Sequence, residues 1–126
     1  MASLRIEHVN VTVGDPERTA KLMGQLFGWH NRWQDPGRDG GRTIHVGAGD
    51  HYLALYAEAD ADGAPRAFAK SQPLNHIGVE VDDLDATEAR AVAAGLKPFS
   101  HGDYEPGRRF YVLDPDGIEY EIVGYG

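Results

Sequence analysis

The sequence contains no cysteine among its 126 residues. This absence excludes disulfide bonds, metal sites built on thiolates and catalysis by a cysteine nucleophile. Long apolar runs are also absent, since no stretch approaches the ~20 apolar residues that a membrane-spanning helix requires. The first residues lack a basic segment followed by an apolar one, which a secretory signal peptide needs. We therefore expect a cytoplasmic protein with no membrane partner.

Basic residues are few relative to acidic ones. Twelve Lys and Arg stand against 20 Asp and Glu, for a formal net charge of −8. Nucleic acids and anionic membranes bind clusters of Lys and Arg, so neither is an expected partner. The hydrophobic fraction of 41% is ordinary for a globular protein, and a chain of this length can bury one sizeable core.

The strongest local pattern is the tetrapeptide Asp-Pro-Asp-Gly at residues 114–117. Pro sets φ at the second position of a turn, and Gly accepts a positive φ at the last. An apolar run precedes the turn and an alternating run follows it, which predicts a β-hairpin. In the second strand Glu119, Glu121 and Val123 share one face, while the opposite face is apolar.

The chain also repeats itself. Residues 4–13 (LRIEHVNVTV) and 74–81 (LNHIGVEV) both alternate between apolar and polar positions, and His8 and His76 occupy matching places in them. Each alternating run is followed by a helical pattern and then by three further strand-like runs. Each half of the sequence therefore reads β-α-β-β-β.

Capping signals mark the start of both predicted helices. Asp15 followed by Pro is a strong helix start, and Gly28 is placed to end that helix. In the second half, Asp85 is a plausible N-cap, with Glu88 three residues later as in a capping box.

The repeat predicts an α+β fold for a single domain over residues 1–126. The first module covers residues 4–58, a linker covers 59–73, and the second module covers 74–126. Half a chain of this size cannot bury its own sheet. Two βαβββ modules side by side predict a curved, mixed, eight-stranded sheet around a cleft, with the helices outside. The strand faces that carry His8, His76 and Glu121 would then point into the cleft.

These features resemble the vicinal oxygen chelate superfamily. The resemblance rests on the two modules, on a His in the first strand of each, and on Asp-Pro-Asp-Gly with Glu four residues after the Gly. It covers essentially the whole chain and is most specific in LNHIGVEVDDLD and FYVLDPDGIEYE. The superfamily includes glyoxalase I, bleomycin-resistance proteins, extradiol dioxygenases and fosfomycin-resistance thiol transferases. The resemblance implies their common fold and a homodimer.

The resemblance also implies a divalent metal bound by His8, His76 and Glu121. Two imidazoles and one carboxylate can occupy one face of an octahedron and leave the opposite face free for a small-molecule substrate. The metal would act as a Lewis acid on a substrate that chelates it through neighbouring oxygens. These ligands suit Fe, Mn, Ni, Co or Zn, and the sequence does not choose among them. Taken singly, each residue also fits an ordinary packed or solvated position.

Glyoxalase I-like proteins take a further Glu ligand from the last strand of the first module. Here the matching position falls at Leu53 or Ala54, neither of which can bind a metal. Glu58 is four or five residues further on, about 13 Å or more along a strand. This departure favours the three-ligand relatives, the extradiol dioxygenases and the thiol transferases.

Tyr111 is the second catalytic candidate beside Glu121. It lies ten residues earlier, on the neighbouring hairpin strand, where its phenol can hydrogen-bond a substrate oxygen or move a proton. An ordinary core aromatic is the alternative interpretation. Four other residues are weaker candidates for contact with substrate, namely Asn10, Thr12, Trp33 and Arg109.

Two functions are consistent with these residues. The first is a metal-dependent enzyme, which would be a glyoxalase-like lyase, an extradiol-type dioxygenase or a thiol transferase. The second is a metal-free protein of the bleomycin-resistance type that sequesters a small molecule. The sequence leaves open whether the two histidines meet within one chain or across two.

Overall fold

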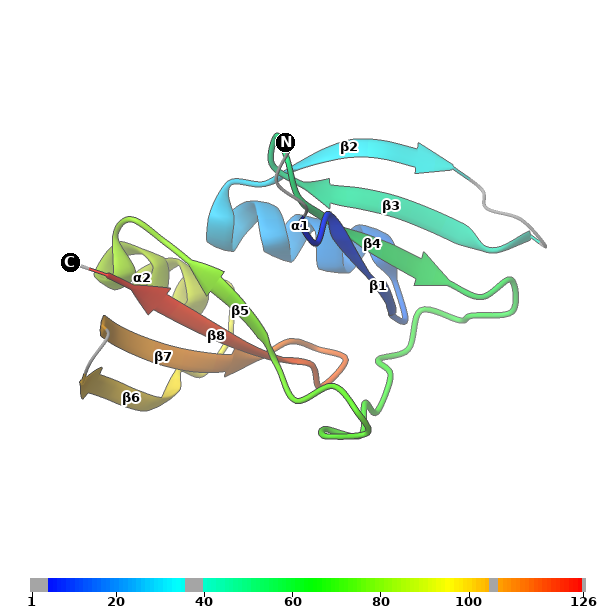
Figure 1. Cartoon of the computed structure of the whole chain (residues 1–126). Helices are drawn as coiled ribbons and strands as arrows, with labels where there is room; N and C mark the ends of the chain where they lie inside the picture. The colour runs from blue at the N-terminus through cyan, green and yellow to red at the C-terminus, as the bar shows by residue number, and fades with distance from the viewer. Residues whose placement is uncertain (1–4, 36–39, 105–106, 126) are drawn as a thin grey trace. The chain divides into compact units, whose positions relative to one another are not determined.

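The computed structural model describes residues 5–35, 40–104 and 107–125. The elements follow in the order β1 (His8–Thr12), α1 (Pro16–Phe27), β2 (His30–Asp35), β3 (Arg42–Gly47), β4 (Tyr52–Ala57), β5 (Ile77–Glu80), α2 (Leu84–Ala93), β6 (Phe99–Tyr104), β7 (Gly107–Leu113) and β8 (Glu119–Gly124). This order repeats β-α-β-β-β twice (Figure 1). The predicted α+β class and the two βαβββ modules are confirmed.

The strands form two four-stranded sheets, with the orders β1-β4-β3-β2 and β5-β8-β7-β6. In each sheet the first strand of the module pairs in parallel with the last, and the other neighbours are antiparallel. The chain divides into two compact units, which meet in sequence at Ala64 and Pro65, with Gln25–Phe27 grouped with the second unit. Each unit thus contains one sheet, and we describe the two separately.

Alternation along the strands separates two faces in each sheet, one of which carries most of the apolar core. In the first sheet Leu53 and Leu55 are almost fully buried, and α1 lies along one side of that sheet (Figure 1). In the second sheet the buried side chains include Phe110, Tyr120 and Ile122. The residues between these positions point to the opposite face of each sheet, and the candidate site residues are among them.

The first helix begins as predicted. The carboxylate of Asp15 accepts hydrogen bonds from the backbone N–H groups of Glu17 and Arg18 at 3.1 and 3.3 Å. Gly28 ends the helix with a φ of 69°, a left-handed conformation that Gly adopts without steric cost.

The predicted cap of the second helix is wrong. Asp83, not Asp85, is the N-cap, and its carboxylate accepts a hydrogen bond from the backbone N–H of Ala86 at 3.0 Å. The helix begins at Leu84, which is 8% exposed. A cap at Asp83 includes this buried residue in the helix, whereas a cap at Asp85 would leave it outside. Asp85 lies in the first turn and instead pairs with Arg108 at 3.2 Å.

The first strand of each module is shorter than predicted. β1 begins at His8 and β5 begins at Ile77, whereas the alternating patterns begin at residues 4 and 74. Residue 4, the predicted start of the first module, and residue 126, the predicted end of the second, lie outside the described residues. His8 therefore opens its strand, and His76 directly precedes its own.

The linker is attached to the hairpin turn of the second unit. The backbone N–H of Arg66 donates to the carboxylate of Asp116 at 2.7 Å, and the N–H of Phe68 donates to the carbonyl of Asp116 at 3.1 Å. The segment just before the second module is thereby fixed against the turn that leads into β8.

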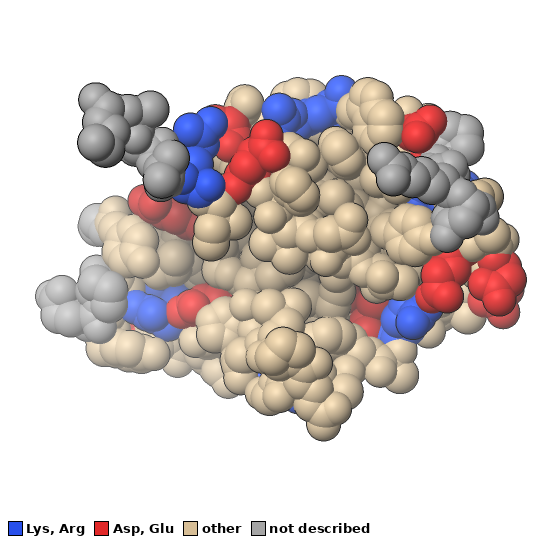
Figure 2. All heavy atoms as spheres, turned by 45° about the vertical axis from the view of Figure 1, so that its right-hand side comes forward, with Lys and Arg blue, Asp and Glu red and all other residues tan. Residues whose placement is uncertain are grey.

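The surface carries charges of both signs. On the face drawn in Figure 2, acidic and basic side chains of the described residues lie next to one another. One ion pair between partly exposed side chains joins Arg42 and Glu17 at 3.0 Å. None of the helices in the described part of the chain is long and apolar enough to span a membrane.

Candidate functional site

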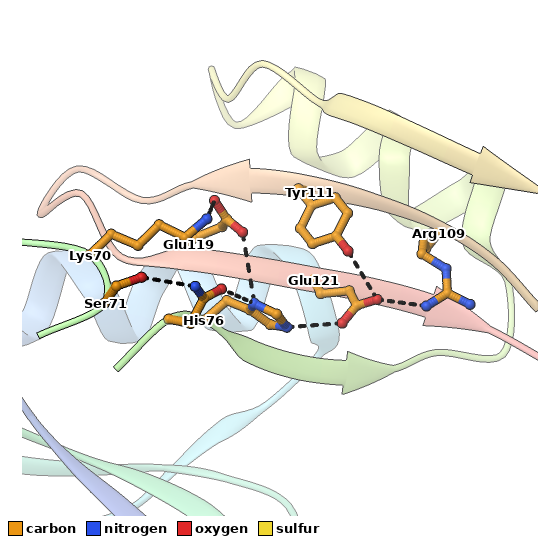
Figure 3. A network of polar contacts seen from close by, with 8 residues as sticks. Lys70, Ser71, His76, Arg109, Tyr111, Glu119 and Glu121 are labelled. Atoms are coloured by element: carbon orange, nitrogen blue, oxygen red, sulfur yellow. Dashed lines mark hydrogen bonds and ion pairs between the residues drawn. The ribbon is translucent and has the colours of Figure 1, made fainter. Parts of the chain in front are cut away.

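The carboxylate of Glu121, in the middle of β8, is the centre of a polar network in the second unit (Figure 3). The Nε2 atom of His76 lies 3.1 Å from its Oε1 atom. Arg109 Nη1 donates to Oε2 at 2.8 Å, and the hydroxyl of Tyr111 donates to Oε2 at 3.2 Å. The two oxygens of this carboxylate therefore have different partners.

Strand register explains why these side chains meet. Tyr111 on β7 is directly opposite Glu121, and Gly78 on β5 is opposite Glu121 on its other side. A Cβ atom on Gly78 would approach Oε1 of Glu121 to 4.0 Å. This is an ordinary van der Waals distance.

The second ring nitrogen of His76 is also fixed. Nδ1 lies 2.6 Å from the side-chain oxygen of Asn75, whose amide nitrogen donates to the hydroxyl of Ser71 at 2.9 Å. The amide of Asn75 thus presents its oxygen to the ring, and Nδ1 is the donor. A histidine held at Nδ1 in this way directs Nε2 to its other partner, as metal-binding histidines commonly do.

A second carboxylate lies on the same face of β8. Glu119 is 7% exposed and pairs with Lys70 at 2.8 Å, while its other oxygen lies 3.8 Å from Nδ1 of His76. The 2.6 Å contact with Asn75 is the hydrogen bond of that nitrogen, so Glu119 acts on the ring through its charge. Strand alternation places Glu119 on this face without indicating a role, and no local pattern in the sequence indicates Lys70 or Asn75.

Burial shapes the electrostatics of the network. The side chains of Glu121 and Arg109 are 16% and 11% exposed, so they form a largely buried ion pair. Burial, together with the negative charge of Glu121, raises the pKa of Tyr111 above its ordinary value. At neutral pH the phenol is therefore protonated, and it donates a hydrogen bond to the carboxylate.

The donor pair has a spacing that suits a hydrogen bond and that a divalent metal can also bridge. Metal–nitrogen and metal–oxygen bonds of about 2.1 Å at a right angle place two ligand atoms about 3 Å apart. The distance between His76 Nε2 and Glu121 Oε1 is 3.1 Å. Arg109 and Tyr111 occupy Oε2, which leaves Oε1 as a single donor. The residues of the second unit therefore fit two positions of a metal site.

Four other predicted residues lie in the first unit, namely His8, Asn10, Thr12 and Trp33. His8, Asn10 and Thr12 are exposed on β1 and alternate with buried positions such as Val11. His8 pairs with Glu7 at 3.0 Å and stacks on the ring of Tyr52 at 4.9 Å. Within the described residues no group of three His, Asp or Glu side chains has the geometry of a metal site. The full set of His8, His76 and Glu121 stays a prediction.

Ring side chains from all four strands contact one another on the face of the first sheet that carries His8. The ring of Tyr52 on β4 contacts His8 on β1 and His45 on β3, and His45 contacts Trp33 on β2 at 4.8 Å. We call Trp33, His45 and Tyr52 the aromatic row. Burial and the nearby charges of His8 and Arg32 lower the pKa of His45. Of the aromatic row, Trp33 alone was a candidate from the sequence, because His45 and Tyr52 lie in short strands rich in apolar residues.

Strand register also identifies the residue of the first module that corresponds to Glu121. Asn10 is paired with Ala54 in the first sheet, as Gly78 is paired with Glu121 in the second. Because Asn10 and Gly78 are related by the sequence repeat, Ala54 is the counterpart of Glu121. A methyl side chain cannot bind a metal, so the first module provides no carboxylate at this place.

The comparisons with known proteins agree with this architecture. The model of the Glyoxalase/Bleomycin resistance protein/Dioxygenase superfamily matches residues 5–122. The chain belongs to this superfamily, as its sequence predicts.

Individual relatives are distant. A protein of Vibrio cholerae named "Probable lactoylglutathione lyase" is 25% identical, and the match covers 98% of this chain and 92% of the relative. The glyoxylase/bleomycin resistance protein/dioxygenase domain from Frankia sp. EAN1pec superposes with a TM-score of 0.83 at 21% identity, covering 99% of this chain and all of that one. The fosfomycin resistance protein FosX from Listeria monocytogenes, complexed with Mn(II) and sulfate, gives 0.76 at 15% identity, covering 100% and 95%.

Proposed function

We propose that this protein is a divalent-metal-dependent enzyme that acts on a small substrate bearing neighbouring oxygens. The observation that carries this proposal is the pair His76 Nε2 and Glu121 Oε1, 3.1 Å apart, with the far side of each group already held. The Mn(II) in the Listeria FosX structure supports the proposal, because that protein has the same fold.

The ligand set that we propose is His8, His76 and Glu121. His8 is the counterpart of His76 in the sequence repeat, and its side chain is 44% exposed. A bound metal would supply Lewis-acid chemistry to the substrate oxygens. It is one of Fe, Mn, Ni, Co or Zn, since all suit imidazole and carboxylate ligands.

The chain's own residues have distinct tasks in this proposal. Arg109 neutralises the Glu121 carboxylate and keeps Oε2 away from the metal position. Tyr111 orients the same carboxylate and carries the proton that a substrate oxygen can share. Three reaction classes fit these roles, namely lyase or isomerase chemistry, oxygenation and addition of a thiol. With Ala54 at the fourth position, the latter two are favoured over a four-ligand lyase.

Metal affinity of variants tests the site. The dissociation constant for Mn²⁺ would be measured by chelator competition for His76→Ala and Glu121→Gln, with His101→Ala as the control. His101 pairs with Glu88 of α2 at 2.6 Å, outside the network around Glu121. Loss of a ligand should weaken binding at least 100-fold, while the control should stay within threefold of the wild type. Unchanged affinity in His76→Ala would reject the assignment.

A second function, sequestration of a small molecule without a metal, is supported by one observation. Arg109 already balances the charge of Glu121 at 2.8 Å, so the carboxylate has a cation partner without any metal. Binding of a ligand with no turnover, at the same affinity with and without a chelator of divalent metals, would favour this function over the enzyme.

We also propose that the protein forms a homodimer, as its membership of the superfamily suggests. Sedimentation equilibrium would give a mass of about twice the 13.8 kDa of one chain.

A further inference from the structure

The aromatic row is extended by a cation at the edge strand. The register of β2 against β3 shifts between Asn31 and Trp33, so Arg32 is an extra residue in the strand. As a result, two consecutive side chains reach the same face. The Arg32 guanidinium lies over the ring of Tyr52 at 4.7 Å, while Trp33 contacts His45 at 4.8 Å.

Trp33 leaves much of its indole open to solvent. The residue is 50% exposed, and among the described residues His45 is its one ring partner. An exposed tryptophan beside further aromatic rings is typical of a binding surface, because a flat ligand gains contact area there without ordering the protein.

Charges of both signs lie beside the row, and Arg32 is the group there that can bind an anion. The carboxylate of Glu7 has two partners within the first unit. It contacts His8 Nδ1 at 3.0 Å and accepts a hydrogen bond from the hydroxyl of Tyr52 at 3.3 Å. Arg32, in contrast, makes no hydrogen bond to another side chain within the described residues. Its five N–H donors are available to a carboxylate, which they can bind at two points.

We propose that the aromatic row and Arg32 form a binding site for planar aromatic acids, in which the ring stacks on Trp33 and the acid group pairs with Arg32. The site is built entirely from the first unit and does not require the metal proposed above. Its ligand is defined by a flat conjugated ring and one negative charge, whether that ligand is the enzyme's substrate or a separate molecule.

Three probes separate the requirements of this site, each measured by equilibrium dialysis against the whole protein in a buffer containing EDTA. 2-Naphthoate is planar and anionic, cyclohexanecarboxylate is anionic but not planar, and 2-naphthylmethylammonium is planar but cationic. We expect 2-naphthoate to bind at least tenfold more tightly than either of the others. Because no metal is present, this result is independent of the metal site.

Two variants and one control locate the binding. Trp33→Leu and Arg32→Gln should each weaken 2-naphthoate binding about fivefold or more, whereas Trp29→Phe should leave it within twofold. The chain has two tryptophans, so an NMR spectrum resolves two indole N–H signals, and only that of Trp33 should shift with 2-naphthoate.

The proposal is overturned if the wild type does not bind 2-naphthoate, or if cyclohexanecarboxylate binds equally well. It is also overturned if Arg32→Gln binds 2-naphthoate as the wild type does. Arg32 is an exposed side chain on an edge strand, so this variant stays informative even if Trp33→Leu fails to fold.

Discussion

The two carboxylate oxygens of Glu121 have different partners. Its Oε2 atom is held by Arg109 and Tyr111, whereas its Oε1 atom faces His76. A carboxylate fixed at one oxygen cannot rotate freely, so the other oxygen has a defined direction. This asymmetry is the feature of the second unit that best distinguishes a ligand from a solvated surface residue.

Asp114, in the turn before β8, is a buried acid with a different role. It is 5% exposed, and its Oδ1 atom accepts hydrogen bonds from the backbone N–H groups of Asp116 and Ile118, both at 2.9 Å. Burial raises the pKa of Asp114 to about 6, against the opposing effect of these hydrogen bonds, and the charge of Asp116 adds to the rise. The folded protein therefore binds a proton at Asp114 more tightly than the unfolded chain does.

This pKa predicts how stability changes with pH. The stabilisation from the protonated acid is complete below the ordinary pKa of 3.8 and is lost as the pH rises through about 6. Asp114→Asn keeps the Oδ1 acceptor but cannot ionise. Between pH 4 and pH 7 the free energy of unfolding of this variant, relative to the wild type, should rise by roughly 2–3 kcal/mol. Urea unfolding across that range measures the difference.

Gly49→Ala, in the connection from β3 to β4, provides the control, because it removes no titratable group. Its difference from the wild type should stay constant over the same pH range. Parallel curves for Asp114→Asn and the wild type would contradict the assignment of a raised pKa to Asp114.

At the scale of elements, the connection from β1 to α1 depends on a close backbone contact. Gly14 lies in this connection, and a Cβ atom there would collide with the carbonyl oxygen of Ala64. Gly49, in the connection from β3 to β4, is a matched contrast, since a Cβ atom there would meet nothing within 4 Å.

We expect Gly14→Ala to lower the free energy of unfolding by about 2–3 kcal/mol, because the backbone on one side of the contact must move. Gly49→Ala should change it by less than about 0.5 kcal/mol. Chemical denaturation of the two variants tests the pair. Equal stability of the two would show that the contact between Gly14 and Ala64 is not formed.

The elements were predictable where the sequence carries short-range signals. The alternating runs, the turn at residues 114–117 and the cap at Asp15 each depend on a few neighbouring residues, and the structure has each of them. The cap of α2 was misassigned because Asp83 and Asp85 are chemically alike. Only the burial of Leu84, a tertiary effect, selects between them.

Part of the candidate site was predictable for the same reason. His76, Tyr111 and Glu121 follow from strand alternation and hairpin register, and the structure brings them together. Arg109 pairs with Glu121 in the structure, and its contact with substrate stays a prediction. The aromatic row was missed, because it depends on pairing across four strands and on a bulge at Arg32 that no local pattern shows.

At the scale of the whole molecule, the two modules have the same strand order and pairing but carry different side chains. Corresponding positions carry Ala54 and His45 in the first sheet, and Glu121 and Tyr111 in the second. One module therefore presents aromatic rings and the other a buried carboxylate network.

We propose that one divalent metal would be held by residues of both modules. The most direct measurement is the metal-to-chain ratio, by elemental analysis, of the wild type and His8→Ala, each stripped of metal and reloaded with a single divalent ion. We predict a ratio of about one for the wild type and close to zero for His8→Ala. A wild type that holds none of the five metals, or a His8→Ala variant that keeps its full content, would contradict the claim.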